Sequence, residues 1–274
     1  MPEPDPISFA RACAPLTFDG TRGSAAIPEG WGQGRASFGG LVLAAALVAA
    51  RRALPEPRPC RAVVAAFPAP VGPGELELEV YALRHGRAVS SLRAELRQGA
   101  ELGCVALASF GSARASAIAV PPPPRPAAPP PEELPPLIPD VPGADRVAPQ
   151  FTRHFDYRLA FGAVPYSGAD VREIGGWCRF RAEPGPLGEE HALALVDAWP
   201  SPAVSRMGAP APAASMTWSL ELLEIEPDPA PDGWWLYRAE LELAAGGYAH
   251  AAARLWSPAG RLAALSRQAV AIFG

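Results

Sequence analysis

Alternating and continuous apolar runs divide the chain into strand-like and helix-like segments. Residues 75–81 read Glu-Leu-Glu-Leu-Glu-Val-Tyr, an alternation that predicts a strand with one buried face. Residues 41–54 are instead rich in Ala, Leu and Val and carry Arg51 and Arg52 near their end, which predicts a buried helix ending before Pro55. Further strand-like runs lie at residues 62–67, 88–97 and 102–110. One buried helix followed by antiparallel strands is an α+β arrangement.

The second half of the chain repeats this order. Residues 191–199 predict a short apolar helix that ends before Pro200, and four strand-like runs follow at residues 215–223, 234–244, 248–256 and 262–272. Gly86 and Gly247 lie in turn-like segments 161 residues apart, and Gly99 and Gly260 have the same separation. Two turns at one separation, with a strand of matching length between them, predict an internal duplication.

A proline-rich segment separates the two halves. Residues 120–149 include the run PPPPRPAAPPPEELPPLIPDVPG, and proline both fixes φ and removes a backbone donor, so neither a helix nor an inner strand can pass through it. The segment is typical of an extended, polyproline-like connector, with a Pro-rich recognition segment as the alternative. We therefore predict an N-terminal half at residues 1–118, a linker at 119–150 and a C-terminal half at 151–274.

Composition and charge narrow the class of protein. The chain has 274 residues, of which 49% are hydrophobic and 19% charged, with a formal net charge of −4, and it contains neither Lys nor Asn. This is a globular composition without the basic face that nucleic-acid binding requires, and it excludes Lys-dependent covalent chemistry. The four cysteines are scattered without metal-ligand or disulfide spacing, so we expect no metal site and no cofactor.

The N-terminal residues and the apolar segments indicate in which cellular compartment the protein resides. The first residues carry acids and prolines before any apolar run, which does not suit a signal peptide. The most apolar early segment, residues 41–50, is too short to span a bilayer, so we expect no membrane insertion. A cytoplasmic protein is the expectation.

The order of these motifs resembles the acyl-CoA thioesterase II-like family. In the first half a helix follows Gly-Gly, a strand ends in Phe-x-x-Pro, and Leu-Arg-x-Gly-Arg-x-x-Ser precedes Gln-x-Gly or a close variant of it. The matching segments here are Gly39-Gly40, Phe67–Pro70, Leu83–Ser90 and Gln98-Gly99, and in the second half Leu195–Ala198, Ala214–Leu220 and Gly260–Gln268. The resemblance implies a double hotdog fold, in which each of two helices packs on an antiparallel sheet and the sheets are joined. It also implies acyl-CoA as the substrate.

The resemblance further implies a catalytic trio in the second half: Asp197, Ser215 and Gln268. The chain departs from the family pattern in two ways, because Ser215 stands where Thr is usual and Thr217-Trp218 stands where an Asp-His pair can follow. The first change keeps a hydroxyl. The second alters the local hydrogen bonding.

The trio residues also stand out, to different degrees, from their neighbours in the sequence. Asp197 interrupts an apolar helix, and a buried carboxylate is costly unless it is hydrogen-bonded; a helix-terminal Asp that meets solvent or caps the loop at Ser201 is the alternative. Gln268 lies in an apolar strand, where the alternative is an outward-facing polar residue. Ser215 is the weakest of the three, because a Ser at a strand start is commonly a turn former. A carboxylate, a hydroxyl and a carboxamide can together orient a water for attack on a thioester carbonyl and stabilise the oxyanion.

We expect Gly39, Gly40 and Arg87 to contact the substrate. His85 and Arg87 flank Gly86 in a turn, which suits either a solvated hairpin or a contact with the phosphates of CoA. His154, His191 and His250 have no partner at the spacing of a metal site or catalytic triad, and no G-x-S-x-G motif is present. A hotdog hydratase or dehydratase is a second hypothesis, weakened because no His follows Asp197 closely. A non-catalytic acyl-binding hotdog protein is the third.

Assembly is the last expectation from the sequence. Hotdog sheets have edges that tend to pair, so we expect a homodimer or a higher oligomer. Trp234, Trp235 and Tyr237 supply apolar area that would suit the interface between subunits.

Overall fold

A single antiparallel sheet dominates the computed structural model, which describes residues 7–139, 148–223 and 232–273. In the described residues this sheet has twelve strands in the order β1-β2-β6-β7-β8-β5-β11-β14-β13-β12-β10-β9. The strands of its first half are β1 (Thr17–Phe18), β2 (Arg22–Ile27), β5 (Cys60–Ala66), β6 (Gly74–His85), β7 (Val89–Gln98) and β8 (Glu101–Gly111). Those of its second half are β9 (Phe155–Gly162), β10 (Glu173–Phe180), β11 (Ala213–Leu222), β12 (Trp235–Ala245), β13 (Tyr248–Trp256) and β14 (Leu262–Ile272).

The strand order reads the same from both ends of the sheet. Reading outward from the central pair of β5 and β11, β8 matches β14, β7 matches β13, β6 matches β12 and β2 matches β10. Gly99 and Gly260 lie in matching turns, and both have positive φ (60° and 81°), which a residue with a side chain adopts at a cost. The two halves are therefore related by a pseudo-twofold axis between β5 and β11, and the predicted α+β double hotdog fold is confirmed.

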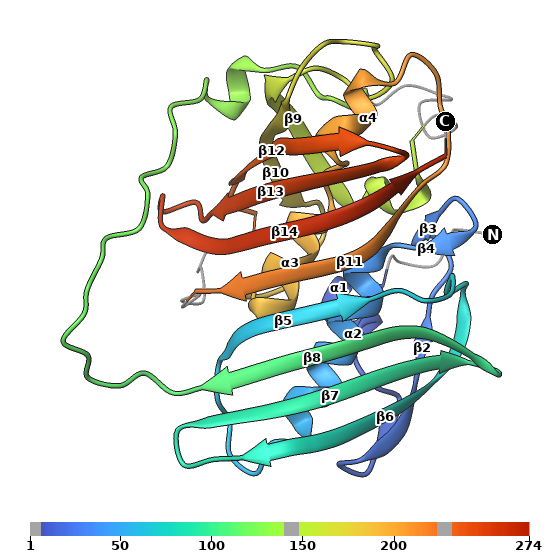
Figure 1. Cartoon of the computed structure of the whole chain (residues 1–274), viewed down its shortest axis with the longest axis vertical. Coiled ribbons are helices and arrows are strands. Elements are labelled where there is room, and N and C mark those ends of the chain that lie inside the picture. Colours follow the sequence, from blue (N-terminus) through green and yellow to red (C-terminus); the bar gives the residue numbers. More distant parts are fainter. Residues whose placement is uncertain (1–6, 140–147, 224–231, 274) are drawn as a thin grey trace.

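Two helices pack side by side on one face of this sheet (Figure 1). They are α2 (Gly39–Arg52) and α3 (Glu189–Asp197), close to the two helices that the apolar runs predict. Most of α2 is completely buried, from Gly40 to Ala50, because its Ala, Leu and Val side chains fill the space between α3 and the strands. The start of α2 lies against the end of α3, so the two helices run antiparallel.

The remaining elements are short. They are helix α1 (Phe9–Ala12), helix α4 (Pro202–Arg206), the 3₁₀ turns η1 (Pro131–Glu133) and η3 (Gln150–His154), and a hairpin of β3 (Gly32–Gln33) with β4 (Ala36–Ser37). The hairpin leads directly into α2 and contacts η3 across the boundary between the halves.

Strands β2, β9 and β10, like the two-residue strands β1, β3 and β4, had no clear signal in the sequence. The clearest reason is in β10, where Gly175 and Gly176 interrupt the apolar pattern and mark an irregularity in the pairing with β9. A side chain on either glycine would overlap the backbone of a neighbouring strand, about 2 Å from a carbonyl oxygen in each case (2.2 and 1.9 Å). The two glycines therefore allow β9 and β12 to approach β10 closely.

The proline-rich linker contacts the C-terminal half over part of its length. Trp177 Nε1 donates a hydrogen bond of 2.8 Å to the Pro129 carbonyl, and the guanidinium of Arg125 lies 5.4 Å from the Trp177 ring. Figure 1 shows the preceding stretch as an extended strap beside the sheet. Residues 140–147 of the predicted linker lie outside the described residues, and the predicted domain boundaries stay a prediction.

The predicted role of the aromatic residues near 235 at a subunit interface is wrong for two of them. Trp235 and Tyr237 are buried within the chain, because odd-numbered positions of β12 point toward the helices. Trp234 is only partly buried, but it packs on the cluster around Trp177 and lies under the guanidinium groups of Arg158 and Arg179. These residues contribute to the core and its margin.

Candidate active site

The carboxylate, hydroxyl and carboxamide predicted as a catalytic trio lie in hydrogen-bond contact. Gln268 Nε2 donates to Asp197 Oδ1 at 3.2 Å and to Ser215 Oγ at 2.9 Å. As whole residues, all three are half-buried. Asp197 and Gln268 are 71 residues apart in the sequence. The fold brings them together because α3 packs on the inner face of β13 and β14.

Local structure explains why each side chain points to the same place. Asp197 is the last residue of α3 and leaves the helix where Pro200 prevents its continuation. Ser215 stands at an irregularity in the pairing of β11 with β14, which changes the direction of its side chain relative to the regular alternation. Gln268 pairs with Trp218 across the strands, and both side chains face the helices, as the hydrogen bond from Trp218 Nε1 to Ser266 Oγ also shows.

The N-terminal end of α2 supplies a further partner to the carboxylate. The Gly40 N–H donates to Asp197 Oδ2 at 2.7 Å. Among the described residues, no acceptor bonds the Gly39 N–H, which stands one residue earlier in the first turn. Free N–H groups at a helix N-terminus carry partial positive charge and bind anionic oxygens. A side chain at Gly39 would lie 3.1 Å from Asp197 Oδ2, so glycine keeps this approach open.

Burial raises the pKa of Asp197 from 3.8 to about 6, while the hydrogen bonds from Gly40 and Gln268 oppose the rise. The carboxylate is thus ionised near neutral pH and still basic enough to accept a proton from water. A pKa near the working pH is what a general base requires.

Aromatic side chains lie close to the carboxylate, and no pattern in the sequence pointed to them. The Trp199 indole lies between two phenol rings, edge-on to Tyr157 at 5.5 Å and stacked on Tyr237 at 5.9 Å. Burial raises the pKa of both phenols, and the charge of Asp197 adds to the effect. Among the described residues, no partner bonds the buried Tyr157 hydroxyl or Trp199 Nε1. The wall beside Asp197 is therefore mostly aromatic.

The opposite ends of the same two helices carry a different set of groups. Arg51, near the end of α2, pairs with Glu189 at 2.6 Å and with Glu190 at 2.9 Å, both in the first turn of α3. The Cys60 N–H donates to the carboxylate of Glu189 at 2.9 Å. The pseudo-twofold axis relates this ion cluster to the Asp197 site, so the chain has one trio and one ion cluster at equivalent places.

Arg87 lies far from the trio. It stands in the turn between β6 and β7, at the end of the sheet where Cys60 pairs with Phe110, whereas Thr217, next to the trio, pairs with Ala66 at the other end of β5. The fold brings Gly39 and Gly40 to Asp197 and leaves Arg87 at the opposite end.

Three of the four histidines, His85, His154 and His191, lie apart from the trio, whereas His250 lies close to Gln268 but on the outer face of the sheet. His191 is buried, accepts the Gly188 N–H at Nδ1 and contacts Glu183 through Nε2. His154 stacks on Trp31 with its Nε2 3.2 Å from the Gly30 carbonyl oxygen. No histidine hydrogen-bonds a trio residue in the described part of the chain. Nor does that part contain three His, Cys, Asp or Glu side chains grouped as metal ligands.

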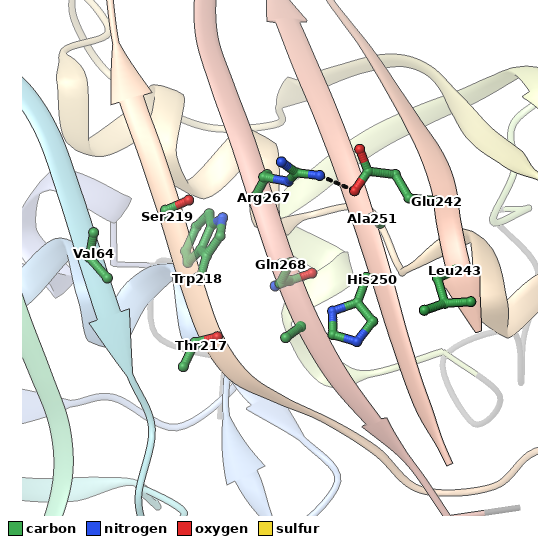
Figure 2. Close-up of a pocket in the computed structure, with 11 residues that line it drawn as sticks. Val64, Thr217, Trp218, Ser219, Glu242, Leu243, His250, Ala251, Arg267 and Gln268 are labelled. Carbon is green, nitrogen blue, oxygen red and sulfur yellow. Dashed lines mark hydrogen bonds and ion pairs between the residues drawn. The ribbon is translucent and has the colours of Figure 1, made fainter. Parts of the chain in front are cut away.

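A broad hollow of about 520 Å³ lies on the face of the sheet that points away from the helices (Figure 2). Thr217, His250 and Arg267 border it, and Arg267 pairs there with Glu242. Gln268 contributes to the floor of the hollow, although its side chain is hydrogen-bonded on the helix side. This hollow therefore lies on the other side of the sheet from the hydrogen bonds that join the trio.

Comparisons with known proteins agree with this architecture. Residues 27–111 match the acyl-CoA thioesterase N-terminal domain, and residues 131–272 match the acyl-CoA thioesterase C-terminal domain. No curated protein matches the chain in sequence. None of the helices in the described residues has the length and hydropathy needed to cross a membrane.

Several solved structures share the fold. A conserved protein of unknown function with a hot dog fold from Alicyclobacillus acidocaldarius has a TM-score of 0.82 at 23% identity, covering 97% of this chain and 98% of its own. A candidate thioesterase II from Thermobifida fusca YX has a TM-score of 0.81 at 21% identity, covering 98% and 99%. An acyl-CoA thioesterase II, TesB2, from Mycobacterium marinum has a TM-score of 0.74 at 19% identity, covering 96% and 97%.

Fold and site together define a double hotdog protein with a carboxylate–hydroxyl–carboxamide group beside a helix N-terminus. The two domain matches extend over most of its length. The chain belongs to the acyl-CoA thioesterase family.

Proposed function

We propose that the protein hydrolyses acyl-CoA to a free acid and CoA, with water as the nucleophile. The observation that carries the proposal is the contact of Gln268 with both Asp197 and Ser215, beside the start of α2. Family membership supports the reaction class, and the geometry supports the residues.

In the proposed mechanism Asp197 is the general base. Its carboxylate accepts a proton from a water molecule that Ser215 and Gln268 hold in place, and the water oxygen bonds to the thioester carbonyl carbon. The carbonyl π electrons move to oxygen, which forms a tetrahedral oxyanion. Collapse of this intermediate breaks the C–S bond, and the thiolate of CoA leaves with the proton that Asp197 took up. Water and thioester thus become acid and thiol, with no covalent enzyme intermediate.

The oxyanion needs donors that are already in position. The Gly39 N–H lies at the positive end of α2, one residue from the N–H that binds Asp197. We assign it to the carbonyl oxygen of the substrate, because preorganised backbone donors stabilise a developing negative charge strongly in a site with little water. Gly40 then orients the base and Gly39 receives the oxyanion, which gives the two glycines separate roles.

The two competing hypotheses fit the site less well. A hydratase or dehydratase of the hotdog type would use a His close to its carboxylate, and none of the four histidines bonds the trio in the described residues. A non-catalytic acyl-binding protein would gain nothing from a carboxylate whose burial is costly. The cost of that burial is easier to understand if the carboxylate has a chemical role.

An assay of thiol release tests the reaction directly. Acyl-CoAs of increasing chain length, a 3-hydroxyacyl-CoA and a 2-enoyl-CoA are incubated with the protein, and free thiol is measured alongside the absorbance of the enoyl group. We expect thiol release from at least one saturated acyl-CoA. Hydration of the enoyl-CoA without thiol release would replace the proposal with the hydratase hypothesis, and binding without either reaction would favour the acyl-binding hypothesis.

We also propose that the protein assembles as an oligomer through the outer face of the sheet. Val64 and Leu107 are paired neighbours at the centre of that face and are 48% and 47% exposed, which makes an apolar centre between polar margins. Such a patch is more typical of an interface than of a solvated surface.

A further inference from the structure

A second hollow lies at the hairpin that precedes α2. It has a volume of about 340 Å³ and is bordered by the hairpin residues Gly32, Gly34 and Arg35 and, from the other half of the chain, by Gln150. Of the described residues that line it, Arg35 alone is charged. As far as the described residues show, the hollow is therefore a partly polar site with one cation, where the hairpin meets the segment that leads into η3.

The guanidinium of Arg35 is accessible. Arg35 is exposed at the tip of the hairpin, and no Asp or Glu side chain in the described residues pairs with it. The adjacent Gly34 has a φ of 65°, and the space where its side chain would stand is open. On the other side, the Gln150 amide oxygen comes within 2.8 Å of the side-chain position of Gly32. The hairpin thus presents a cation beside a carboxamide.

The hollow is close to the candidate active site along the chain. Arg35 stands four residues before Gly39, so at most about 14 Å of extended backbone separates them. Strand β4 ends at Ser37 and α2 begins at Gly39, which makes the connection short and direct. In Figure 1 the β3–β4 hairpin lies at the same side of the molecule as the start of β11, where Ser215 stands.

We propose that this hollow binds a phosphate of the CoA nucleotide, with Arg35 as its ion-pair partner. The inference rests on the proposed function for the choice of ligand. A thioester held with its carbonyl at Gly39 extends its pantetheine arm away from the acyl group, and such an arm is long enough to reach the hairpin. The phosphates at the end of the arm need a cation and polar donors, and Arg35 and Gln150 are of the right chemistry.

The acyl group does not suit the same place. The hollow has an open, partly polar lining with an arginine, whereas an acyl chain requires an enclosed apolar wall. The charged end of the substrate therefore lies at the hairpin, and the acyl end lies toward the aromatic residues beside Asp197.

Equilibrium binding of free CoA separates this subsite from catalysis. The dissociation constants of CoA and of pantetheine, which lacks the phosphates, are measured by calorimetry with the full chain and with Arg35→Ala. We expect Arg35→Ala to weaken CoA binding about tenfold, the usual size of a partly exposed charge-assisted contact, and to leave pantetheine binding unchanged. Raised salt should weaken CoA binding to the unaltered protein more than to the variant.

Arg114→Ala is the matched control, because Arg114 is also an exposed arginine and lies after β8, outside the hollow. Equal affinity of Arg35→Ala and the unaltered protein for CoA, or an equal loss for pantetheine, would overturn the subsite. If CoA binding depends on Arg35 but no thioester is hydrolysed, the subsite stands and the proposed reaction is wrong. If thioesters are hydrolysed but Arg35→Ala binds CoA as tightly as the unaltered protein does, the reaction stands and the subsite is wrong.

Discussion

The carboxylate of Asp197, at the C-terminal end of one central helix, accepts a 2.7 Å hydrogen bond from the Gly40 N–H at the N-terminal end of the other. The two residues come from different halves of the chain and are 157 positions apart. The base of the proposed reaction is thus oriented by the half that carries no trio residue, so neither half contains the complete site.

Replacing Asp197 by Asn should reduce thiol release by about 100-fold or more, because a carboxamide cannot accept the proton of the attacking water. The fold should persist, since the side chain keeps its shape and can still accept the Gly40 N–H. Steady-state kinetics and circular dichroism of the variant check both parts. Turnover equal to that of the unaltered protein would remove Asp197 from the mechanism.

The pH profile of turnover should follow ionisation of the same group. Burial raises the pKa of Asp197 to about 6, and the base must be ionised to act. The rate should therefore rise as pH increases through about 6 and become level above it. Measurement of kcat/KM between pH 4.5 and pH 8, a range set by that value, checks this. A rate that falls as the pH rises through 6 would mean that the carboxylic acid is the active form.

The free energy of unfolding should decrease over the pH range in which turnover increases. The pKa of Asp197 is higher in the folded protein than its ordinary value of 3.8, so the folded state binds the proton more tightly between pH 4 and 6. Ionisation then costs the folded state up to about 3 kcal/mol, and the cost is complete above pH 6. We expect Asp197→Asn to be more stable than the unaltered protein at pH 8 and equally stable below pH 4. Denaturant unfolding at both pH values checks the difference, and a variant that is less stable at pH 8 would contradict it.

Ser215→Ala should lower kcat about tenfold, because the water loses one of its orienting partners while the base remains. Ser215→Thr should retain most of the activity, since it keeps the hydroxyl. Ser219→Ala on the same strand borders the outer hollow and serves as the control, with no effect expected. A loss for Ser215→Thr as large as that for Ser215→Ala would show that packing at the β11 irregularity matters more than the hydroxyl.

Sedimentation velocity at micromolar concentration should show an oligomer. Leu107→Glu should convert it to monomer, because two buried carboxylates at the centre of an interface would lack partners. Leu83→Glu, on an exposed apolar residue of β6, is the control. A monomeric unaltered protein would rule out the interface.

The sequence predicted those parts of the fold where one local pattern is strong. The apolar run of α2 and the strict alternation of β6 determine helix and strand without long-range information. Strand β10 has no such pattern, since its two glycines are explained only by the close approach of its neighbours. The burial of Trp235 and Tyr237 also depends on the pairing partners of β12, which a single sequence does not reveal.

The candidate active site, like the fold, was only partly predictable from local patterns in the sequence. A carboxylate in an apolar helix and a carboxamide in an apolar strand were visible as polar interruptions, and the family resemblance connected them. The aromatic wall and Arg35 were not identifiable, because Trp199 and Tyr157 look like ordinary core residues and an exposed arginine in a glycine-rich turn looks like a solvated one. Their importance depends on which elements meet, and that is decided by tertiary contacts.

The ion cluster of Arg51 with Glu189 and Glu190 shows what a single chain with two halves allows. In a dimer of identical hotdog subunits, one gene encodes both symmetric sites, so every mutation alters them together. Fusion of two copies removes that coupling. In this chain one of the two equivalent places carries the trio, and the other carries charged partners that join α2 to α3. Because the two halves are joined in one chain, two places related by the pseudo-twofold axis can carry different side chains.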